Sequence, residues 1–470
     1  MRANQKFFLV AIAIGLAAAG PVFPHAAEQG FVLLLPTKAY ISAGTLAVAA
    51  TMLLLAFVKP GQLAKLLRPF DTRLPGHWLA PPPFVAVIGS LCLALLIYVG
   101  LVGPSDPQAN LLPLALWTVW WMAMFIVQGL VFDIWRWINP WPGLHRLICP
   151  DDRPVLTLPP CLSAWPAMVI FIAFQGFVLA DVAPNDPDRL ARFALGYWAF
   201  TFLGMTVFGR GPWLRQVECF TVLFNLIGLL RCARARDTLE IGLPGWQAFE
   251  AGGLDLSRAV FVLVMLAAGS FDGLHETFWW LHLVGVNPLE FPGRSAMVWK
   301  TSLGLYGGVA FLILVFTTSV WIGLMALDHP RKEQRPVSIS FAFKQFSITL
   351  LPIAIGYHFA HYFVTFLVQI QYVVANFADP LAAGWNLFGL GGTRVKVGFL
   401  TVPEIVKVIW ITQAGIVVIS HVLAVVMSHR TAEILCSNRR DIVRIQLGLS
   451  VLMVAYTLFG LWLLASPRGA

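Results

Sequence analysis

Residues 84–103 read FVAVIGSLCLALLIYVGLVG, an apolar run that contains no charged side chain. A helix of about 20 apolar residues crosses the ~30 Å hydrocarbon core of a bilayer, so this stretch predicts a transmembrane span. Comparable runs recur along the chain, and we predict spans near residues 40–58, 84–103, 111–135, 161–180, 193–209, 258–283, 297–327, 343–372, 403–428 and 445–465. The sequence therefore predicts an all-α, polytopic transmembrane helical bundle of about ten spans.

The composition supports a membrane protein. The chain has 470 residues, of which 58% are hydrophobic and 12% are charged, and its mean hydropathy is +0.77. Soluble domains are only about half apolar. The net charge of +9 comes from basic residues in short runs between apolar segments, a pattern typical of topology signals. We therefore expect the lipid bilayer and a small-molecule or ion substrate as partners, and no nucleic acid.

The N-terminus resembles a secretion signal. Arg2 and Lys6 precede an apolar core at residues 7–19, and the small residues Ala26 and Ala27 follow it, although Pro24 and His25 occupy positions where small residues are preferred. Residues 1–27 are therefore predicted to be a signal peptide, with an uncleaved first helix as the alternative. Residues 28–470 would then form a single transmembrane helical domain.

Charge alternates between successive predicted loops. If the mature chain starts outside, the cytoplasmic loops carry Lys59, Lys65, Arg68, Arg73, Arg136, Arg146, Arg153, Arg331, Lys332, Arg335, Arg430, Arg439, Arg440 and Arg444. The external loops carry Asp106, Asp181, Asp186, Asp188, Glu290 and Asp379, and few basic residues apart from Arg189, Arg192, Arg294, Arg394 and Lys396. This satisfies the positive-inside rule. We expect a multi-pass protein of the bacterial inner membrane with both mature termini external.

One apolar segment is too short to span the bilayer. Residues 217–230 are flanked by Arg210 and Arg215 on one side and by three further arginines on the other. We predict a re-entrant or interfacial helix near 217–230 on the cytoplasmic face, since irregular backbone is tolerated where protein or a water-filled cavity covers it. The alternative, a short tilted span, would invert the topology of everything that follows.

Ionisable residues lie inside two predicted spans, where they are costly and usually paired or functional. In the sixth span, Asp272, His275 and Glu276 occur at i, i+3 and i+4 and so share one helical face. His282 follows seven residues after His275 on the same predicted face.

The eighth predicted span carries His358 and His361, three residues apart. Because both spans run outward, the two polar faces should meet in the outer half of the bundle. Imidazole nitrogens and a carboxylate suit a divalent metal, so we predict a centre held by Asp272, His275, His358 and His361. Zinc is the favoured metal, with copper and iron as alternatives. A hydrogen-bonded core network in which these groups satisfy one another is the competing interpretation.

Two further carboxylates complete the predicted site. Glu276 would act as the general base. Asp379 lies in the external loop 376–400, whose glycines suggest a hinged cap within reach of the helix that carries His358.

Three other interior polar residues are predicted to be structural. Asp133 lies beside Arg136, and Glu218 follows Arg215, so both carboxylates should form ion pairs. His421 has no evident partner at its depth and should be a core histidine.

Four motifs resemble a bacterial family of membrane proteins known as fenitrothion hydrolases. They are Asn139-Pro140-Trp141, Gly356-Tyr357-His358-Phe359-Ala360-His361-Tyr362-Phe363, Ala378-Asp379-Pro380 and Asn386-Leu387-Phe388-Gly389. The similarity is strongest over residues 340–430. It implies a membrane hydrolase that acts on organophosphate esters.

Three classes of function fit these observations. A metal-dependent hydrolase of phosphoester-like substrates would use a metal to lower the pKa of bound water at a site open to the external side. A proton- or metal-coupled secondary transporter would use the same residues as an ion relay. The third class is a non-catalytic subunit for metal handling or assembly.

Overall fold

The computed structural model describes residues 32, 35–76, 81–289, 293–327, 337–390 and 394–468. Within these ranges nine helices are long and apolar enough to cross a membrane, or up to ten if one bent helix pair counts as a span. The predicted all-α, polytopic bundle is therefore confirmed. The predicted signal peptide 1–27 and the basic residues at 331–335 lie outside the described residues.

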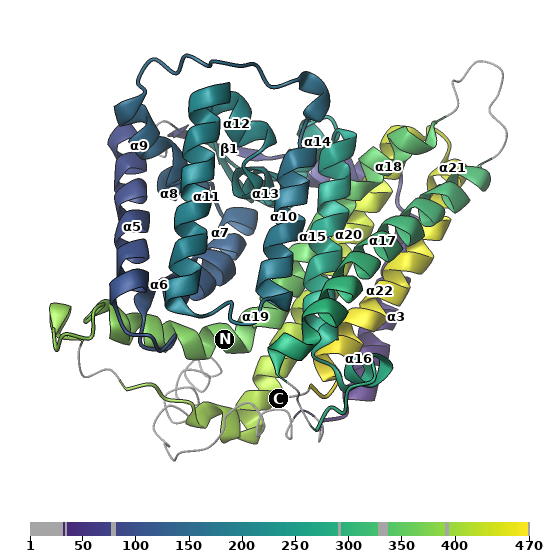
Figure 1. Cartoon of the computed structure of the whole chain (residues 1–470). Helices are drawn as coiled ribbons and strands as arrows, with labels where there is room; N and C mark the ends of the chain where they lie inside the picture. Colours follow the sequence, from purple (N-terminus) through teal and green to yellow (C-terminus); the bar gives the residue numbers. More distant parts are fainter. Residues whose placement is uncertain are drawn as a thin grey trace.

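Most helices of the first part of the chain lie at one side of Figure 1, whereas α3 lies at the other side, beside α22 (Leu447–Ala465). The elements of this part are α3 (Thr37–Leu55), α4 (Gln62–Leu66), β1 (Phe70–Pro75), α5 (Pro83–Val102), α6 (Leu111–Leu114), η2 (Ala115–Met124), α7 (Phe125–Leu130), α8 (Trp135–Ile138), α9 (Trp141–Ile148), η3 (Pro160–Leu162), α10 (Trp165–Ala180) and α11 (Pro187–Phe208). α10 has 16 residues and is shorter than the other spans.

The span from α6 to α7 is irregular at its centre. All ten residues of η2 are π-helical, with hydrogen bonds from residue i to i+5. Such segments are rare and frequently occur at functional sites. η2 carries Trp120 and Trp121 side by side, and their indoles lie in different surroundings described below.

The short apolar segment forms a bent pair, as expected of a re-entrant element. α12 (Arg210–Gln216) meets α13 (Cys219–Ile227) and η4 (Gly228–Leu230) at an angle of 65°. In Figure 1, α12 and the following α14 (Trp246–Glu250) lie at the same end of the bundle, so the chain returns to the side it left. Between them, β2 (Ala233–Ala235) and β3 (Thr238–Ile241) join β1 in an antiparallel sheet of order β1-β3-β2.

The remaining elements complete the bundle. They are α15 (Leu256–His275), α16 (Phe278–Leu283), α17 (Arg294–Met325), α18 (Ile339–Ser347), η5 (Ile348–Leu350), α19 (Leu351–Phe377), η6 (Leu387–Gly389), η7 (Gly398–Thr401), α20 (Pro403–Leu435), α21 (Arg439–Arg444) and α22 (Leu447–Ala465). Figure 1 shows the final turns of α19 passing beneath the helices of the first half.

The sixth predicted span, 258–283, is broken near its end. α15 stops at His275, and the Thr277 hydroxyl accepts a hydrogen bond from the backbone N–H of Trp280, which starts α16. Since a side chain that caps a helix fixes where it begins, His282 belongs to a separate helix and is exposed. The expectation that His282 shares the face of His275 is therefore wrong.

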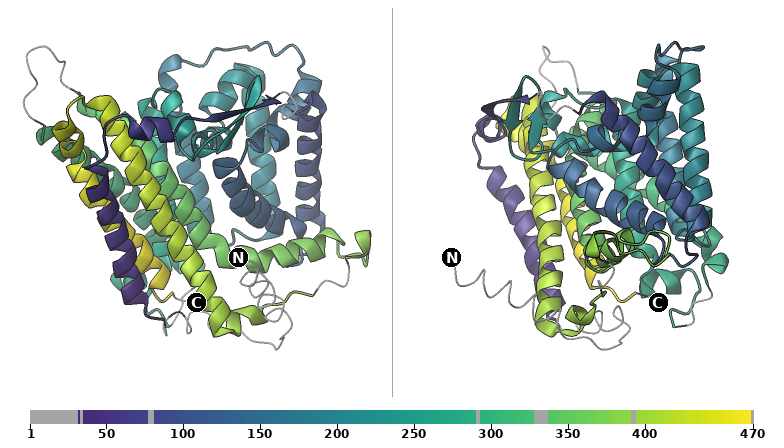
Figure 2. Two further views of the ribbon diagram at one scale, coloured as in Figure 1. Left: turned by 180° about the vertical axis from the view of Figure 1, so that it is seen from behind. Right: turned by 90° about the vertical axis from the view of Figure 1, so that its left-hand side faces the viewer.

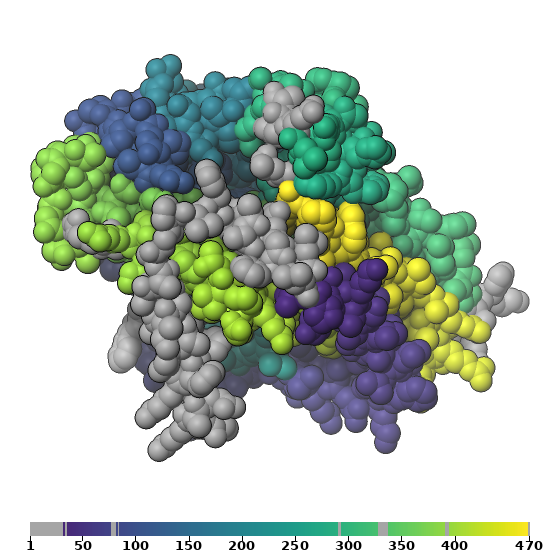
Figure 3. Space-filling view, turned by 90° about the horizontal axis from the view of Figure 1, so that it is seen from below, coloured from purple at the N-terminus to yellow at the C-terminus, as the bar shows by residue number. Residues whose placement is uncertain are grey.

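The helices that carry the predicted site are the most buried. Of the most apolar stretch of each span, 78% is buried in α15 and 72% in the α18–α19 pair, against 11% in α3. α3 packs on α20 and α22 at the edge of the bundle, as Figures 2 and 3 show. α15 and α19 therefore form the centre around which the other spans pack, and the ionisable residues on them are removed from lipid.

Asp255 provides a test of what holds α15 in place. Its carboxylate caps the helix by accepting from the N–H of Arg258 and also binds the Ser257 hydroxyl and the Arg258 guanidinium. Burial raises the pKa of Asp255, but these hydrogen bonds and the arginine outweigh burial and lower the pKa to about 2. Asp255→Ala should destabilise the protein by about 1 kcal/mol near neutral pH.

Thermal melting followed by circular dichroism in detergent measures this effect. Asp255→Asn keeps the capping oxygen and should lose less. Because the folded pKa lies below the ordinary value of 3.8, the advantage of wild type over Asp255→Asn is present above pH 3.8 and shrinks as the pH falls towards 2. An advantage that grows with acidification would contradict this account.

Candidate functional site

A buried carboxylate in the last turn of α15 forms the centre of the candidate site. The side chain of Asp272 is 12% exposed, and its Oδ2 accepts a hydrogen bond from the Tyr362 hydroxyl of α19. His361 Nε2, also on α19, lies 3.2 Å from the same oxygen. One carboxylate oxygen thus joins a histidine and a tyrosine from the neighbouring helix.

His358, one turn before His361 on α19, is held by a different element. Its Nε2 lies 2.9 Å from the backbone carbonyl of Trp121 in η2, and its ring stacks on Phe125 with centroids 4.0 Å apart. A carbonyl can only accept, so Nε2 carries the proton in this contact. His358 is therefore bound to the wall formed by η2 and α7 and makes no hydrogen bond to Asp272.

The other residues predicted for the α15 face point elsewhere. His275 Nδ1 lies 2.6 Å from the backbone carbonyl of Asp272 in its own helix. Glu276 follows the end of α15, where its side chain is 45% exposed and lies 3.6 Å from Arg468. Glu276 is therefore paired at the surface of the bundle and is not joined to Asp272.

Asp379 is remote from the cluster. α19 continues to Phe377, 16 residues beyond His361, which corresponds to ~24 Å along the helix axis. The Asp379 carboxylate accepts from the N–H groups of Ala383 and Gly384 and so closes its own loop. The structure does not bring Asp379 to the site, and Gly391 and Gly392 of the predicted cap lie outside the described residues.

The four predicted metal ligands are only partly assembled. Asp272, His358 and His361 line one cavity of about 20 Å³, whereas His275 does not. Within the part of the chain that the structure describes, no group of three or more His, Cys, Asp or Glu side chains could hold a metal ion. The arrangement matches the competing interpretation more closely, because Asp272 and His361 contact each other directly.

A glycine allows the two central helices to approach. A Cβ atom on Gly273 would lie 1.8 Å from the Tyr357 hydroxyl and 3.5 Å from His361 Nδ1. Among the described residues, neither the Tyr357 hydroxyl nor His361 Nδ1 has a hydrogen-bond partner, although both are buried. His361 Nδ1 is thus free to bind a proton, and both atoms are free to hydrogen-bond a water molecule beside Asp272.

A second polar group lies on the opposite side of α15. Ser270 Oγ and Tyr456 Oη of α22 are 2.5 Å apart. The ring of His421 on α20 lies 6.3 Å from that of Tyr456, and His421 Nε2 is buried without a partner in the described structure. His421 is buried, as predicted, but it has a polar neighbour that the sequence did not reveal.

The residues predicted to be structural do form contacts, with different partners. Asp133 Oδ1 pairs with Arg231 at 2.9 Å. The buried Glu218 carboxylate caps α13 through the N–H groups of Phe220 and Thr221 and accepts from the Tyr197 hydroxyl at 2.7 Å. Tertiary packing therefore replaces the expected sequence neighbours, Arg136 and Arg215.

No protein-family model matches this chain, and no curated protein or solved structure is significantly similar to it. The resemblance to fenitrothion hydrolases therefore stays a prediction. The function is inferred below from the geometry of the Asp272 cluster.

Three residues of the cluster were not identified as site residues from the sequence: Tyr357, Tyr362 and Gly273. The signal was present for the tyrosines, because a phenol within a buried span needs a partner for its hydroxyl. Nothing local identifies Gly273, because its role depends on the approach of a helix more than 80 residues away in sequence.

Gly273→Ala tests whether close packing of α15 on α19 is required. The new methyl group would overlap the Tyr357 hydroxyl, and overpacking of this kind costs about 1–3 kcal/mol. Gly269→Ala, one turn earlier, is the matched control, since its nearest neighbour would be Tyr357 Cδ1 at 3.9 Å. It should leave the melting temperature unchanged or raise it, because alanine favours the helix.

The double variant Gly273→Ala/Tyr357→Phe removes the overlapping hydroxyl and should regain much of the lost melting temperature. If Gly269→Ala and Gly273→Ala had equal effects, the close approach at Gly273 would be unimportant.

Proposed function

We propose that this chain is a proton-coupled secondary transporter whose proton site is the Asp272–His361 pair. The observation that carries the proposal is the shared contact of one buried carboxylate oxygen with His361 and Tyr362 at the centre of the bundle. Asp and His have ordinary pKa values on either side of the physiological range, so the pair can hold or release a proton without a cofactor.

The position of Asp272 supports a functional role. An ionisable group in the interior of a membrane protein costs several kcal/mol and typically marks an ion or proton pathway. A well-packed apolar side chain in place of a buried pair is often neutral or stabilising, so structural need alone explains the pair poorly.

The surroundings of the pair support proton exchange. The cavity of about 20 Å³ beside Asp272, His361 and Tyr357 is large enough for one water molecule. The partnerless Tyr357 hydroxyl and His361 Nδ1 offer hydrogen-bonding atoms for that water. A proton could therefore move between the carboxylate and the imidazole through short steps.

Irregular elements adjoin the pair, as in many transporters. η2 supplies the carbonyl that holds His358, and the bent α12–α13 pair packs behind the same wall. Interrupted helices near the middle of the membrane commonly form substrate and coupling-ion sites in secondary transporters. Their backbone can rearrange at lower cost than that of a continuous helix.

A metal-dependent hydrolase of phosphoester-like substrates is the second candidate. One observation favours it: three of the four predicted ligands, Asp272, His358 and His361, line the same small cavity. His358 Nε2 donates to the Trp121 carbonyl, so only its Nδ1 could bind a zinc ion, and no three such donor groups converge within the described residues. The present geometry therefore supports proton exchange better.

The proposed location is the inner membrane of a bacterium, with both mature termini external. The first residue of α3 and the last of α22 lie at one end of the bundle in Figure 1, which agrees with an even number of crossings between them. The basic residues near α9, α12 and α21 lie at the opposite end, and the positive-inside rule makes that end cytoplasmic.

Infrared difference spectroscopy of the purified protein tests the proton site. Between about pH 3 and 9, which spans the ordinary pKa values of Asp and His, wild type should show a titrating carboxylic-acid C=O band that disappears in Asp272→Asn. Glu276→Gln, four residues along the chain and paired with Arg468, is the matched control and should keep the band. In proteoliposomes, a pH gradient should drive substrate uptake by wild type and by Glu276→Gln. This uptake should be lost in Asp272→Asn and in His361→Ala.

Two results would contradict this proposal. One is a titration that is identical in wild type and Asp272→Asn. The other is about one bound zinc per chain in wild type that His361→Ala and His358→Ala both lose, which would favour the hydrolase.

Cysteine labelling of intact cells tests the orientation. In a background that lacks the six native cysteines, Asp106→Cys should react with a membrane-impermeant maleimide and Arg153→Cys should not. Both positions are exposed, and they follow α5 and α9, whose last turns lie at opposite ends of the bundle in Figure 1. Both should react after permeabilisation. The reverse pattern would place the basic end outside.

A further inference from the structure

A large apolar cavity lies in the first half of the bundle, separate from the Asp272 cluster. Its volume is about 520 Å³, and it is lined by residues of α5, η2, α8, α9, α10, α11 and α13. This volume is within the range of small-molecule binding sites. The cavity is open on one side, where the exposed side chains of Ile88 and Phe193 line it, so a lipid-soluble molecule can enter it from the bilayer.

The lining excludes a charged ligand. The 25 residues that line the cavity include no Asp, Glu, Lys, Arg or His. A charged molecule would lose its hydration there without compensation. The occupant is therefore neutral and lipid-soluble.

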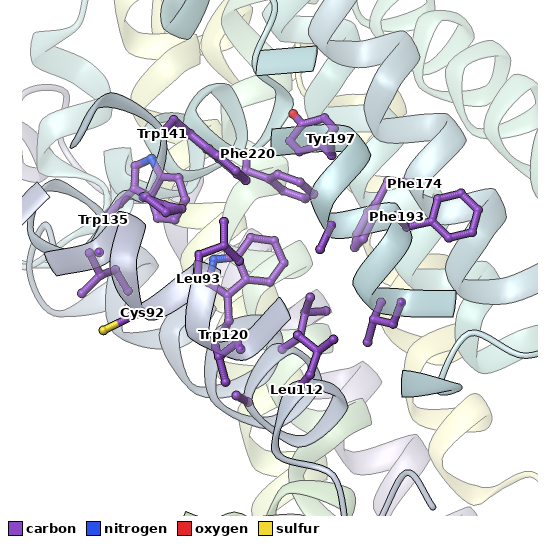
Figure 4. Close-up of a pocket in the computed structure, with 18 of the residues that line it drawn as sticks. Cys92, Leu93, Leu112, Trp120, Trp135, Trp141, Phe174, Phe193, Tyr197 and Phe220 are labelled. Atoms are coloured by element: carbon purple, nitrogen blue, oxygen red, sulfur yellow. The ribbon is translucent and has the colours of Figure 1, made fainter. Parts of the chain in front are cut away.

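Aromatic rings form much of the wall. Figure 4 shows Trp120, Phe174, Phe220 and Tyr197 around one interior space. Trp120 and Phe220 meet edge to face with centroids 4.7 Å apart, as do Phe174 and Phe220 at 5.0 Å. Rings in this arrangement present both faces and edges, which suits a planar ring in the ligand.

One lining residue offers an unused hydrogen-bond donor. Trp141 is only 6% exposed, and its indole Nε1 has no partner within the described structure. The neighbouring Tyr197 hydroxyl is already satisfied, because it donates to Glu218 and accepts from the N–H of Cys219. An indole N–H can only donate, so a ligand that binds it must offer an acceptor atom such as a carbonyl oxygen.

From these features we infer that the cavity binds a neutral lipid with a planar ring and a carbonyl oxygen, a quinone-type molecule, whose oxygen accepts from Trp141 Nε1. The ring would lie among Trp120, Phe174 and Phe220, with its tail along the aliphatic side chains of α5 and α11. This site is independent of the proposed proton exchange at Asp272, and it would remain if that proposal failed.

The cavity and the proton pair nevertheless share two walls. Trp120 of η2 lines the apolar cavity, and Trp121 lines the cavity beside Asp272. On α10, Phe174 lines the apolar cavity and Gln175 lines the cavity beside Asp272. A ligand that displaces η2 or α10 would therefore change the surroundings of the Asp272–His361 pair without contacting the pair.

Thermal melting in phosphatidylcholine nanodiscs, followed by circular dichroism, tests this inference with decylubiquinone as the probe. Decylubiquinone should raise the melting temperature of wild type, whereas decylbenzene, which has a ring and the same tail but no carbonyl, should raise it much less. Ala194→Phe fills the cavity and should abolish the response. Leu195→Phe is the matched control, because Leu195 does not line the cavity and is 45% exposed.

Trp141→Phe keeps the ring and removes the donor, so about 3- to 10-fold more decylubiquinone should be needed for the same shift, the equivalent of one neutral hydrogen bond. This variant decides the matter if Ala194→Phe does not fold. Asp272→Asn should respond like wild type, which separates this site from the proposed function. Equal stabilisation by decylbenzene, or an undiminished response in Ala194→Phe, would overturn the inference.

Discussion

The need to satisfy a carboxylate in an apolar interior constrains the centre of this protein. Asp272 lies near the end of the most buried span, where its Oδ2 can be satisfied only by groups from another helix. Tyr362 and His361 supply them, which requires α19 to pack closely on α15. Gly273 makes that approach possible, because any Cβ there would collide with Tyr357. The register between the two central helices thus depends on this contact, and the other spans pack around the pair.

The two halves of the bundle differ in the chemistry they enclose. Around α15, α19, α20 and α22, polar side chains contact one another in pairs such as Ser270–Tyr456 and Asp272–His361. Between α5 and α13, the interior is a wide apolar cavity lined by rings. η2 separates these environments, and its π-helical geometry is the least regular backbone of any span in the described residues. Because η2 places Trp120 at the apolar cavity and Trp121 beside Asp272, it can couple ligand binding in the cavity to the protonation of the Asp272–His361 pair.

Apolar length predicted the spans, because the bilayer requires it whatever the tertiary fold. The re-entrant segment was predictable for the same reason, since 217–230 was too short and basic on both sides. Features of the fold that do not depend on the length of an apolar segment could not be predicted. Thr277 ends one helix and caps the next, although hydropathy continues to residue 283. Nothing in the sequence predicted that Glu218 would bind Tyr197 or that Asp133 would bind Arg231, since these partners meet only after the helices pack.

The candidate site shows the same limit at the scale of single side chains. Spacing placed His358 and His361 on one broad face, but a step of three residues turns a helix by ~300°, so the two side chains diverge by ~60°. That angle is enough for His361 to reach Asp272 while His358 reaches the carbonyl of Trp121 on another helix. A metal centre requires three or more donors to converge on one point, whereas a proton pair requires two. The packing around α19 satisfies the second requirement directly, whereas in the described residues no three donors converge, because His358 and His361 face different partners.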